Sequence, residues 1–198
     1  MAEKTWREHV RDGEPFDMPD RDFLEAIFAG KAKATAFNNA AVEADLPALQ
    51  QRLRRLFGKV GENVVVVPPL TVDVGFNVEI GEGTFINANA TLLDTYPIRI
   101  GRHVMIGPNC AFYPVGHPLR AAERLRVDTA TGETIGNVTT GDPITIGDEV
   151  WIGGNVVVLP GVTIGNRTTI GAGSVVTKSI PADVFAAGNP CKVIRSLL

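Results

Sequence analysis

Histidine is the side chain best suited to proton transfer near neutral pH, and the chain contains three: His9, His103 and His117. His117 stands between Gly116 and Pro118, where a six-residue sequence repeat meets its longest break. A neutral imidazole there can take the proton of an attacking hydroxyl, which is typically worth ~10²–10⁴ in rate. His103 falls in a turn of the repeat and is expected to be a solvated surface residue. His9 has no evident catalytic neighbours.

The two cysteines, Cys110 and Cys191, are far apart and predict neither a zinc cluster nor a disulfide framework. Cys110 fills a small-residue position of the repeat, and Cys191 has no adjacent histidine. Direct attack by a hydroxyl is therefore favoured over a covalent acyl-enzyme. A zinc enzyme with three histidine ligands is disfavoured, because the repeat region holds His103 and His117 but no third imidazole. We expect no metal requirement.

The scaffold that must position His117 is indicated by the repeat. Apolar residues recur every six positions in three runs, and glycine follows in eight of thirteen cases. A small or β-branched residue stands four positions after each apolar residue, except at Tyr96. The apolar positions are Val74, Ile80, Ile86, Leu92, Ile100, Ile106, Phe112, Ile146, Ile152, Val158, Ile164, Ile170 and Val176.

A period of six fits neither an α-helix nor a hairpin sheet, but it fits a coil with three flat faces, each a short strand and a turn. The apolar residue would point inward and stack on its counterpart in the next coil. The glycine would take backbone angles that a Cβ penalises. We predict a mainly β solenoid over residues 61–198; the alternative is an ordinary β-sandwich with accidental spacing.

The repeat breaks twice, and both breaks are candidate functional regions. The step from Leu92 to Ile100 is eight residues, which predicts a small bulge at 93–97. Residues 114–143 form a long loop, and loops of this length are usually functional or disordered. At most a short exposed helix is expected in it, over 118–126.

Residues 1–60 predict an N-terminal helical segment. Asp17 is the expected N-cap of one helix, and a second helix is expected from Asp45 to Phe57. We expect these helices to cap one end of the solenoid. The same helices could also contribute to binding the acceptor substrate. The first helix would pack through an apolar stripe formed by Phe23, Leu24, Ile27 and Phe28.

The composition argues against several partners. Lys and Arg number 19 against 22 Asp and Glu, for a formal charge of −3, which favours neither nucleic acid nor an anionic membrane. No apolar run approaches the roughly 20 residues that span a bilayer. The first eight residues lack the apolar stretch of a signal peptide. We expect a cytoplasmic protein.

Several segments carry a pattern beyond the Ile-Gly-x-x-Val-x units. They are 13–17, 37–38, 85–89, 97–101, 116–118, 143–154, 171–178 and 188–195. Together they resemble the hexapeptide-repeat acyltransferases, in particular the maltose, galactoside and nodulation-factor O-acetyltransferases, over nearly the whole chain. The resemblance implies a left-handed parallel β-helix with an N-terminal helical segment. It also implies an acetyl-CoA-dependent O-acetyltransferase that acetylates a sugar hydroxyl.

The same resemblance implies a role for individual residues. His117 would be the general base, and Asn87 would stabilise the tetrahedral oxyanion together with the backbone amide near Gly154. Trp151 would pack against the pantetheine arm of acetyl-CoA. Cationic side chains would meet the phosphates, unless they are simply solvated. The remaining coenzyme positions are Ala172, Thr177, Lys178, Lys192 and Arg195.

The implied acceptor positions leave the sugar open. Asp73 stands where the galactoside enzymes have serine, Thr95 stands where they have aspartate, and the loop after His117 is longer than theirs. An antibiotic or serine acceptor, or a non-catalytic scaffold, are the alternatives. Relatives are trimers with active sites between subunits, so a homotrimer is expected to bring Trp151 and His117 together from neighbouring chains. The acceptor positions are Asp17, Asp73, Asn87, Asp94 and Thr95.

Overall fold

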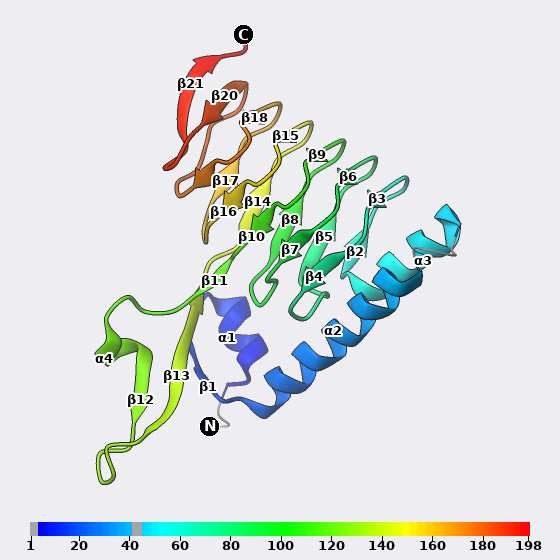
Figure 1. Ribbon diagram of the computed structural model, residues 1–198. Helices are drawn as coiled ribbons and strands as arrows, with labels where there is room; N and C mark the ends of the chain where they lie inside the picture. The colour runs from blue at the N-terminus through cyan, green and yellow to red at the C-terminus, as the bar shows by residue number, and fades with distance from the viewer. Residues whose placement is uncertain (1–3, 41–44) are drawn as a thin grey trace.

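The computed structural model describes residues 4–40 and 45–198, and most of them form a parallel β-solenoid of about six turns (Figure 1). Successive strands enter three sheets in rotation, which we call faces I, II and III. Face I holds β2 (Lys59–Val60), β5 (Val78–Ile80), β8 (Ile98–Ile100), β14 (Ile144–Ile146) and β17 (Thr163–Ile164). Face II holds β3 (Val65–Val66), β6 (Phe85–Ile86), β9 (Met105–Ile106), β15 (Trp151–Ile152), β18 (Thr169–Ile170), β20 (Val184–Ala187) and β21 (Lys192–Ser196). Face III holds β4 (Leu70–Val72), β7 (Ala90–Leu92), β10 (Ala111–Phe112), β16 (Val157–Val158) and β19 (Val175–Val176).

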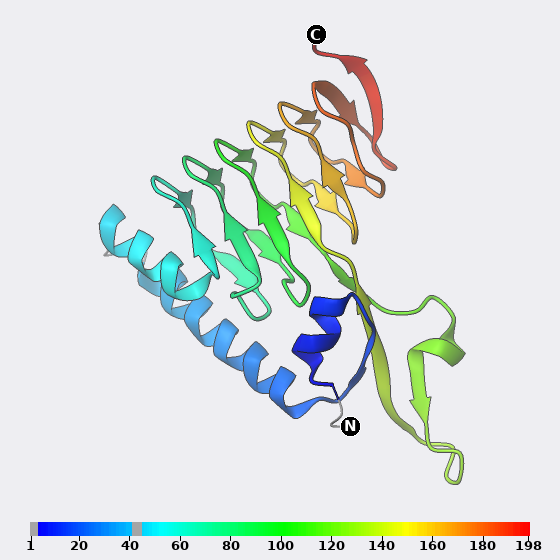
Figure 2. The ribbon, with the colours of Figure 1, turned by 180° about the vertical axis from the view of Figure 1, so that it is seen from behind.

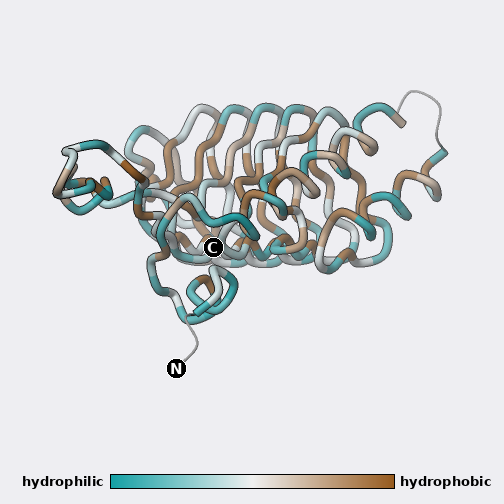
Figure 3. The backbone as a smooth tube through the Cα atoms, turned by 90° about the horizontal axis from the view of Figure 1, so that it is seen from below, coloured by the Kyte–Doolittle hydropathy of each residue, from teal (hydrophilic) through white to brown (hydrophobic). Residues whose placement is uncertain are grey.

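The predicted inward stacking is confirmed at twelve of the thirteen positions; Val74 is buried in a separate apolar cluster, and Val72 is the residue that stacks on Leu92. All thirteen repeat positions are at most 3% exposed. Ile86 pairs in register with Ile106, and Ile106 with Ile152, so identical side chains stack from coil to coil. Each buried aliphatic side chain contributes roughly 1.5–3 kcal/mol relative to an exposed one, and only neighbouring coils share that contact. Hydrophobic and hydrophilic segments accordingly alternate along the coils in Figure 3.

The repeat glycines are required for a different reason than the sequence suggested. Among the eight, only Gly75 has a positive φ, of 82°. At Gly101 an added Cβ would lie 2.6 Å from the carbonyl carbon of Gly147 in the next coil, so close stacking excludes a side chain. The residue with left-handed backbone angles comes two positions after the repeat glycine, as at His103, whose φ is 54°. His103 is exposed in this turn, as expected.

The N-terminal helices cover one end and one edge of the solenoid (Figures 1 and 2). They are α1 (Trp6–Asp12), α2 (Arg21–Ala40) and α3 (Leu46–Leu56). Helix α3 begins at Asp45, whose carboxylate accepts from Ala48 N at 2.9 Å, as predicted. Asn38 of α2 bonds both backbone groups of Leu70, which fixes α2 against β4. No helix in the described part of the chain is long and apolar enough to cross a membrane.

Two expectations for α2 are wrong. Asp17 does not cap it; the residue lies in β1 (Phe16–Met18), and Asp20 accepts from Phe23 N at 2.8 Å instead. The apolar stripe is only partly buried, because Phe23 is 5% exposed whereas Phe28 is 69% exposed. Phe23 packs with α1 and β1 in a second apolar cluster formed by Trp6, Val10, Phe16, Phe23, Val74 and Tyr96.

The long loop is ordered and forms a small sheet beside the solenoid. It contains β11 (Val115–Gly116), α4 (Ala121–Arg124), β12 (Leu125–Val127) and β13 (Thr134–Gly141). Strand β13 pairs antiparallel with β11, with β12 and with β1. The pairing ties the N-terminal segment to the loop. Tyr96, the exception to the repeat, is fully buried and donates its hydroxyl to Glu14 O at 3.0 Å, which strengthens that connection.

Candidate active site

His117 follows β11 at the edge where face III passes to face I. Its Nδ1 lies 2.7 Å from the carbonyl oxygen of Val138 on β13. A carbonyl only accepts hydrogen bonds, so Nδ1 carries the proton in the neutral ring and Nε2 keeps a lone pair. The side chain is exposed. The backbone pairing of β11 and β13 therefore presents an oriented base at an open edge.

Asp17 lies on β1, the strand that pairs with β13 at the His117 contact. It lies directly opposite Val138 in the β1–β13 pairing. Arg126 of β12 donates from Nε to Asp17 Oδ1 at 2.9 Å, and its Nη2 lies 2.7 Å from the same oxygen. The sequence analysis did not single out Arg126, and its only sequence signal is a basic residue in a polar loop.

Three further acceptor positions meet at this III–I edge. Thr95 Oγ1 donates to Asp73 Oδ2 at 3.1 Å. Asp73 is partly buried, and burial raises the pKa of its carboxyl. Thr95 is 2% exposed, so Asp73 is the one of the pair that offers a polar group to the surface.

Asp94 does not offer its side chain to a ligand, which corrects the expected direct contact. It is fully buried, and Oδ1 accepts from the backbone N–H groups of Asp73 and Val74 at 3.1 Å, and Oδ2 from that of Asn77 at 3.2 Å. Burial raises its pKa to about 6, although the backbone N–H groups act in the opposite direction. Asp94 instead shapes the turn that carries Asp73.

Stability should fall as Asp94 ionises. Its pKa rises from an ordinary 3.8 to about 6 on folding, so between these values the folded state holds a proton that the unfolded chain has lost. The free energy of unfolding should therefore decrease from about pH 4 to pH 6, by on the order of 2–3 kcal/mol from this group. Urea unfolding gives the free energy of unfolding of the parent and of Asp94→Asn at pH 4.5 and 7. The change between the two pH values should be larger in the parent than in Asp94→Asn. An unchanged pH dependence in Asp94→Asn, matching that of the exposed control Glu79→Gln, would contradict it.

Asn87 lies on a different edge, where face II passes to face III. Its Oδ1 accepts from Ala88 N at 2.8 Å, which orients the amide. Nδ2 donates to no acceptor within residues 4–40 and 45–198, and neither does the backbone N–H of Gly154 at the same edge. The β6–β9–β15 register places Gly107 and Gly153 in the coils next to Asn87. An added Cβ would lie 2.6 Å from Gly154 N at Gly107 and 2.6 Å from Ala172 N at Gly153, so these glycines allow close stacking of the coils beside the two donors.

The expected coenzyme positions are exposed, apart from the partly buried Gly154, but scattered over the solenoid surface. Trp151 projects from face II with 55% exposure, Ala172 lies at the II–III edge, and Thr177 and Lys178 lie at the III–I edge. Lys192 and Arg195 lie on β21 opposite Ala187 and Phe185. Within the described residues, these three cations form no ion pair.

One chain therefore separates the expected site into two parts. His117, Asp17 and Asp73 gather at the III–I edge, whereas Asn87 and Gly154 lie at the II–III edge, with the strands of face III between them. A single described chain does not bring the base and the amide donors together.

The cysteines offer no alternative nucleophile. Burial raises the pKa of Cys110 and of Cys191, which disfavours the reactive thiolate. The Cys110 thiol donates to Gly153 O at 3.1 Å within the core. Within residues 4–40 and 45–198, no group of three or more His, Cys, Asp or Glu side chains could hold a metal ion.

Known proteins share both the sequence and the fold. The family described as bacterial transferase hexapeptide (six repeats) matches residues 143–178. The galactoside O-acetyltransferase of Escherichia coli is 39% identical over 190 residues, which are 96% of this chain and 88% of that protein.

Two solved structures extend the comparison. A maltose O-acetyltransferase from Clostridium difficile superposes with a TM-score of 0.87 at 37% identity and 98% coverage of both chains. A hexapeptide-repeat acetyltransferase from Vibrio cholerae, complexed with acetyl coenzyme A, gives a TM-score of 0.80 at 37% identity, covering 98% of this chain and 100% of that one.

Proposed function

Because this chain belongs to the hexapeptide-repeat acetyltransferases, we propose that it transfers the acetyl group of acetyl-CoA to a hydroxyl of a sugar, with His117 as general base. The observation that carries the proposal is the 2.7 Å contact between His117 Nδ1 and Val138 O. It leaves Nε2 as the proton acceptor at an open edge. The sugar acceptor rests on the galactoside and maltose relatives.

The reaction needs no covalent enzyme intermediate. His117 Nε2 takes the hydroxyl proton while the hydroxyl oxygen attacks the thioester carbonyl, giving a tetrahedral oxyanion. Asn87 Nδ2 and the Gly154 N–H donate to that oxyanion. Collapse breaks the carbon–sulfur bond, and the imidazolium returns its proton to the leaving thiolate. The products are the sugar acetate and coenzyme A.

The separation of His117 from Asn87 supports a site shared between chains. Face II also presents an exposed column of apolar side chains, because Phe85, Met105 and Trp151 stack in register with exposures of 36%, 57% and 55%. Such a column is suited to burial against a partner. We infer a homotrimer in which His117 of one chain faces Asn87 and Trp151 of the next.

The two parts of the chain then have different roles, one in binding acetyl-CoA and the other in binding the acceptor. Residues 61–198 form the β-helix domain that binds acetyl-CoA, through Trp151, Ala172 and Thr177 among others. The N-terminal helices α1, α2 and α3 cap the solenoid, and β1 supplies Asp17 to the acceptor side; β2 already belongs to face I. Asp73 is the second acceptor contact, with Thr95 and Asp94 as positioning residues.

The experiment for this proposal is an acceptor panel. Thiol release from acetyl-CoA is measured with glucosides, galactosides, maltose, serine and chloramphenicol. We expect release that depends on a sugar. Release with serine or chloramphenicol but with no sugar would contradict the sugar proposal.

Basic residues near the coenzyme should affect acetyl-CoA and not the sugar. Lys178→Ala, Lys192→Ala and Arg195→Ala should each raise the KM for acetyl-CoA by about fivefold or more, because a charged contact to phosphate is lost at a partly screened surface. The KM for the sugar should stay within about twofold of the parent. Lys33→Ala, an exposed lysine on α2, is the matched control. A larger effect on the KM for the sugar than on that for acetyl-CoA would show that these residues do not line the coenzyme groove.

A further inference from the structure

The ion pair between Arg126 and Asp17 joins two segments that are 109 residues apart in the sequence. Both side chains remain substantially exposed, at 45% and 60%. An exposed pair contributes little to stability, so folding alone does not explain it. Its place does suggest a function, because Asp17 lies opposite Val138, whose carbonyl oxygen orients His117.

The backbone holds Arg126 in position for this contact. Arg126 lies opposite Gly136 in the β12–β13 pairing, and the register shifts between Arg126 and Val127. Such irregularities re-aim a side chain out of the regular alternation. A Cβ at Gly136 would collide with the carbonyl oxygen of Met18, so β13 passes tightly against β1. The pairing of β12 with β13 therefore fixes the position from which the Arg126 guanidinium reaches β1.

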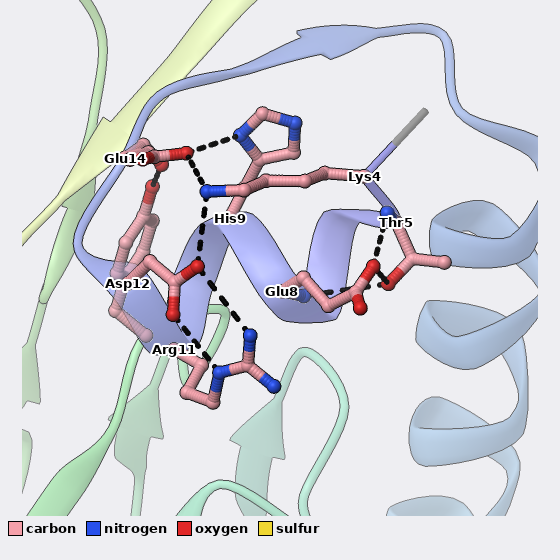
Figure 4. A network of polar contacts seen from close by, with 8 residues as sticks. Lys4, Thr5, Glu8, His9, Arg11, Asp12 and Glu14 are labelled. Atoms are coloured by element: carbon pink, nitrogen blue, oxygen red, sulfur yellow. Dashed lines mark hydrogen bonds and ion pairs between the residues drawn. The ribbon is translucent and has the colours of Figure 1, made fainter. Parts of the chain in front are cut away.

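A cavity of about 620 Å³ opens beside the pair, between α1, β1 and the start of α2. Two of its other charged groups, Lys4 and Asp20, are already engaged. Lys4 Nζ bonds Asp12 at 3.0 Å and Glu14 at 2.8 Å (Figure 4), and Asp20 caps α2. Asp22 lies in the first turn of α2, where the helix dipole favours an acid.

The pair neutralises the Asp17 carboxylate at the mouth of this cavity. Both contacts use Asp17 Oδ1, so Oδ2 can still accept a hydrogen bond from a hydroxyl. The guanidinium Nη1 can likewise still donate. An uncharged polyhydroxylated molecule satisfies both groups, whereas a charged one gains an unpaired partner at this position only if one member of the pair is missing.

We propose that Arg126 is a specificity-determining residue: by pairing with Asp17 it selects uncharged sugars over amino sugars and acidic sugars. The inference rests on the proposed function for its reaction, but charge selection can be measured as binding alone. Removing Arg126 exposes the Asp17 carboxylate to a cationic acceptor. Removing the Asp17 charge exposes the guanidinium to an anionic one.

The test uses three matched ligands, namely methyl glucoside, its 2-amino-2-deoxy analogue and the corresponding uronic acid. Dissociation constants are measured by titration calorimetry, and thiol release from acetyl-CoA is measured in parallel. In Arg126→Ala, the affinity for the amino sugar relative to methyl glucoside should rise about three- to tenfold. In Asp17→Asn, the affinity for the uronic acid relative to methyl glucoside should rise by a similar factor. The double variant should return close to the parent ratio.

Arg102→Ala is the matched control, because Arg102 pairs with Asp148 at 2.8 Å on the distant I–II edge. It should leave all ratios unchanged. Binding ratios in Arg126→Ala and Asp17→Asn that equal those of the parent would overturn the inference, whatever the turnover. Shifted binding ratios without thiol release from any sugar would instead contradict the proposed function and leave charge selection in place.

Discussion

Replacing His117 by alanine is expected to lower kcat by about 10²–10⁴ and to leave acetyl-CoA binding nearly unchanged. The imidazole takes the acceptor proton through Nε2, and Val138 O holds the ring by its other nitrogen. Equal losses in kcat and kcat/KM would mark an interaction made in the transition state. Initial rates at saturating sugar, with acetyl-CoA affinity measured separately, distinguish these effects.

The loss of kcat should be specific to the histidine that contacts the acceptor hydroxyl. His103→Ala is the matched control, since His103 is exposed in a turn at the I–II edge. It should keep parental turnover. A His117→Ala enzyme with near-parental kcat on its best sugar would refute the mechanism.

Loss of the Asn87 amide should lower kcat by about 10²–10³, because Nδ2 would no longer stabilise the developing oxyanion. Asn109→Gly is the control, because Asn109 lies at the same edge one coil further and its φ of 59° suits glycine. The measurement is kcat at saturating acetyl-CoA. An Asn87→Ala effect no larger than that of Asn109→Gly would remove Asn87 from the site.

Mixed assemblies report whether Asn87 and His117 act across a subunit boundary. When Asn87→Ala and His117→Ala chains are unfolded together and refolded in equal amounts, about one quarter of shared sites should hold both intact residues. Activity should recover to about a quarter of the parent. No recovery above the separate variants would place both residues in one chain's site.

The solenoid could be predicted from the sequence because its rule is local. In each coil the same apolar position recurs on every face, as at Ile146, Ile152 and Val158. All three residues are buried, and Ile152, for example, stacks in register on Ile106 of the neighbouring coil. The start of α3 at Asp45 followed from the apolar spacing of its own residues in the same way. Patterns of this kind need no knowledge of distant contacts.

The features that sequence reasoning missed depend on distant contacts. Arg126 reaches Asp17 only because β13 pairs with β12 on one side and β1 on the other. Asp94 looks like a polar surface residue in sequence, yet the backbone of Asp73–Asn77 encloses it. The close approach of coils at Gly101 is likewise a property of the next coil. Such roles follow from pairing between segments, which periodicity does not encode.

On the proposed mechanism, acetyl passes directly from acetyl-CoA to a sugar hydroxyl, with His117 as the general base. The direct measurement uses acetyl-CoA labelled in the acetyl group with an uncharged glycoside, and compares label on the sugar oxygen with thiol released, for the parent and for His117→Ala. We predict one label on the sugar for each thiol released by the parent, with both nearly abolished in His117→Ala. Thiol release without sugar label, or equal labelling by His117→Ala, would contradict the account.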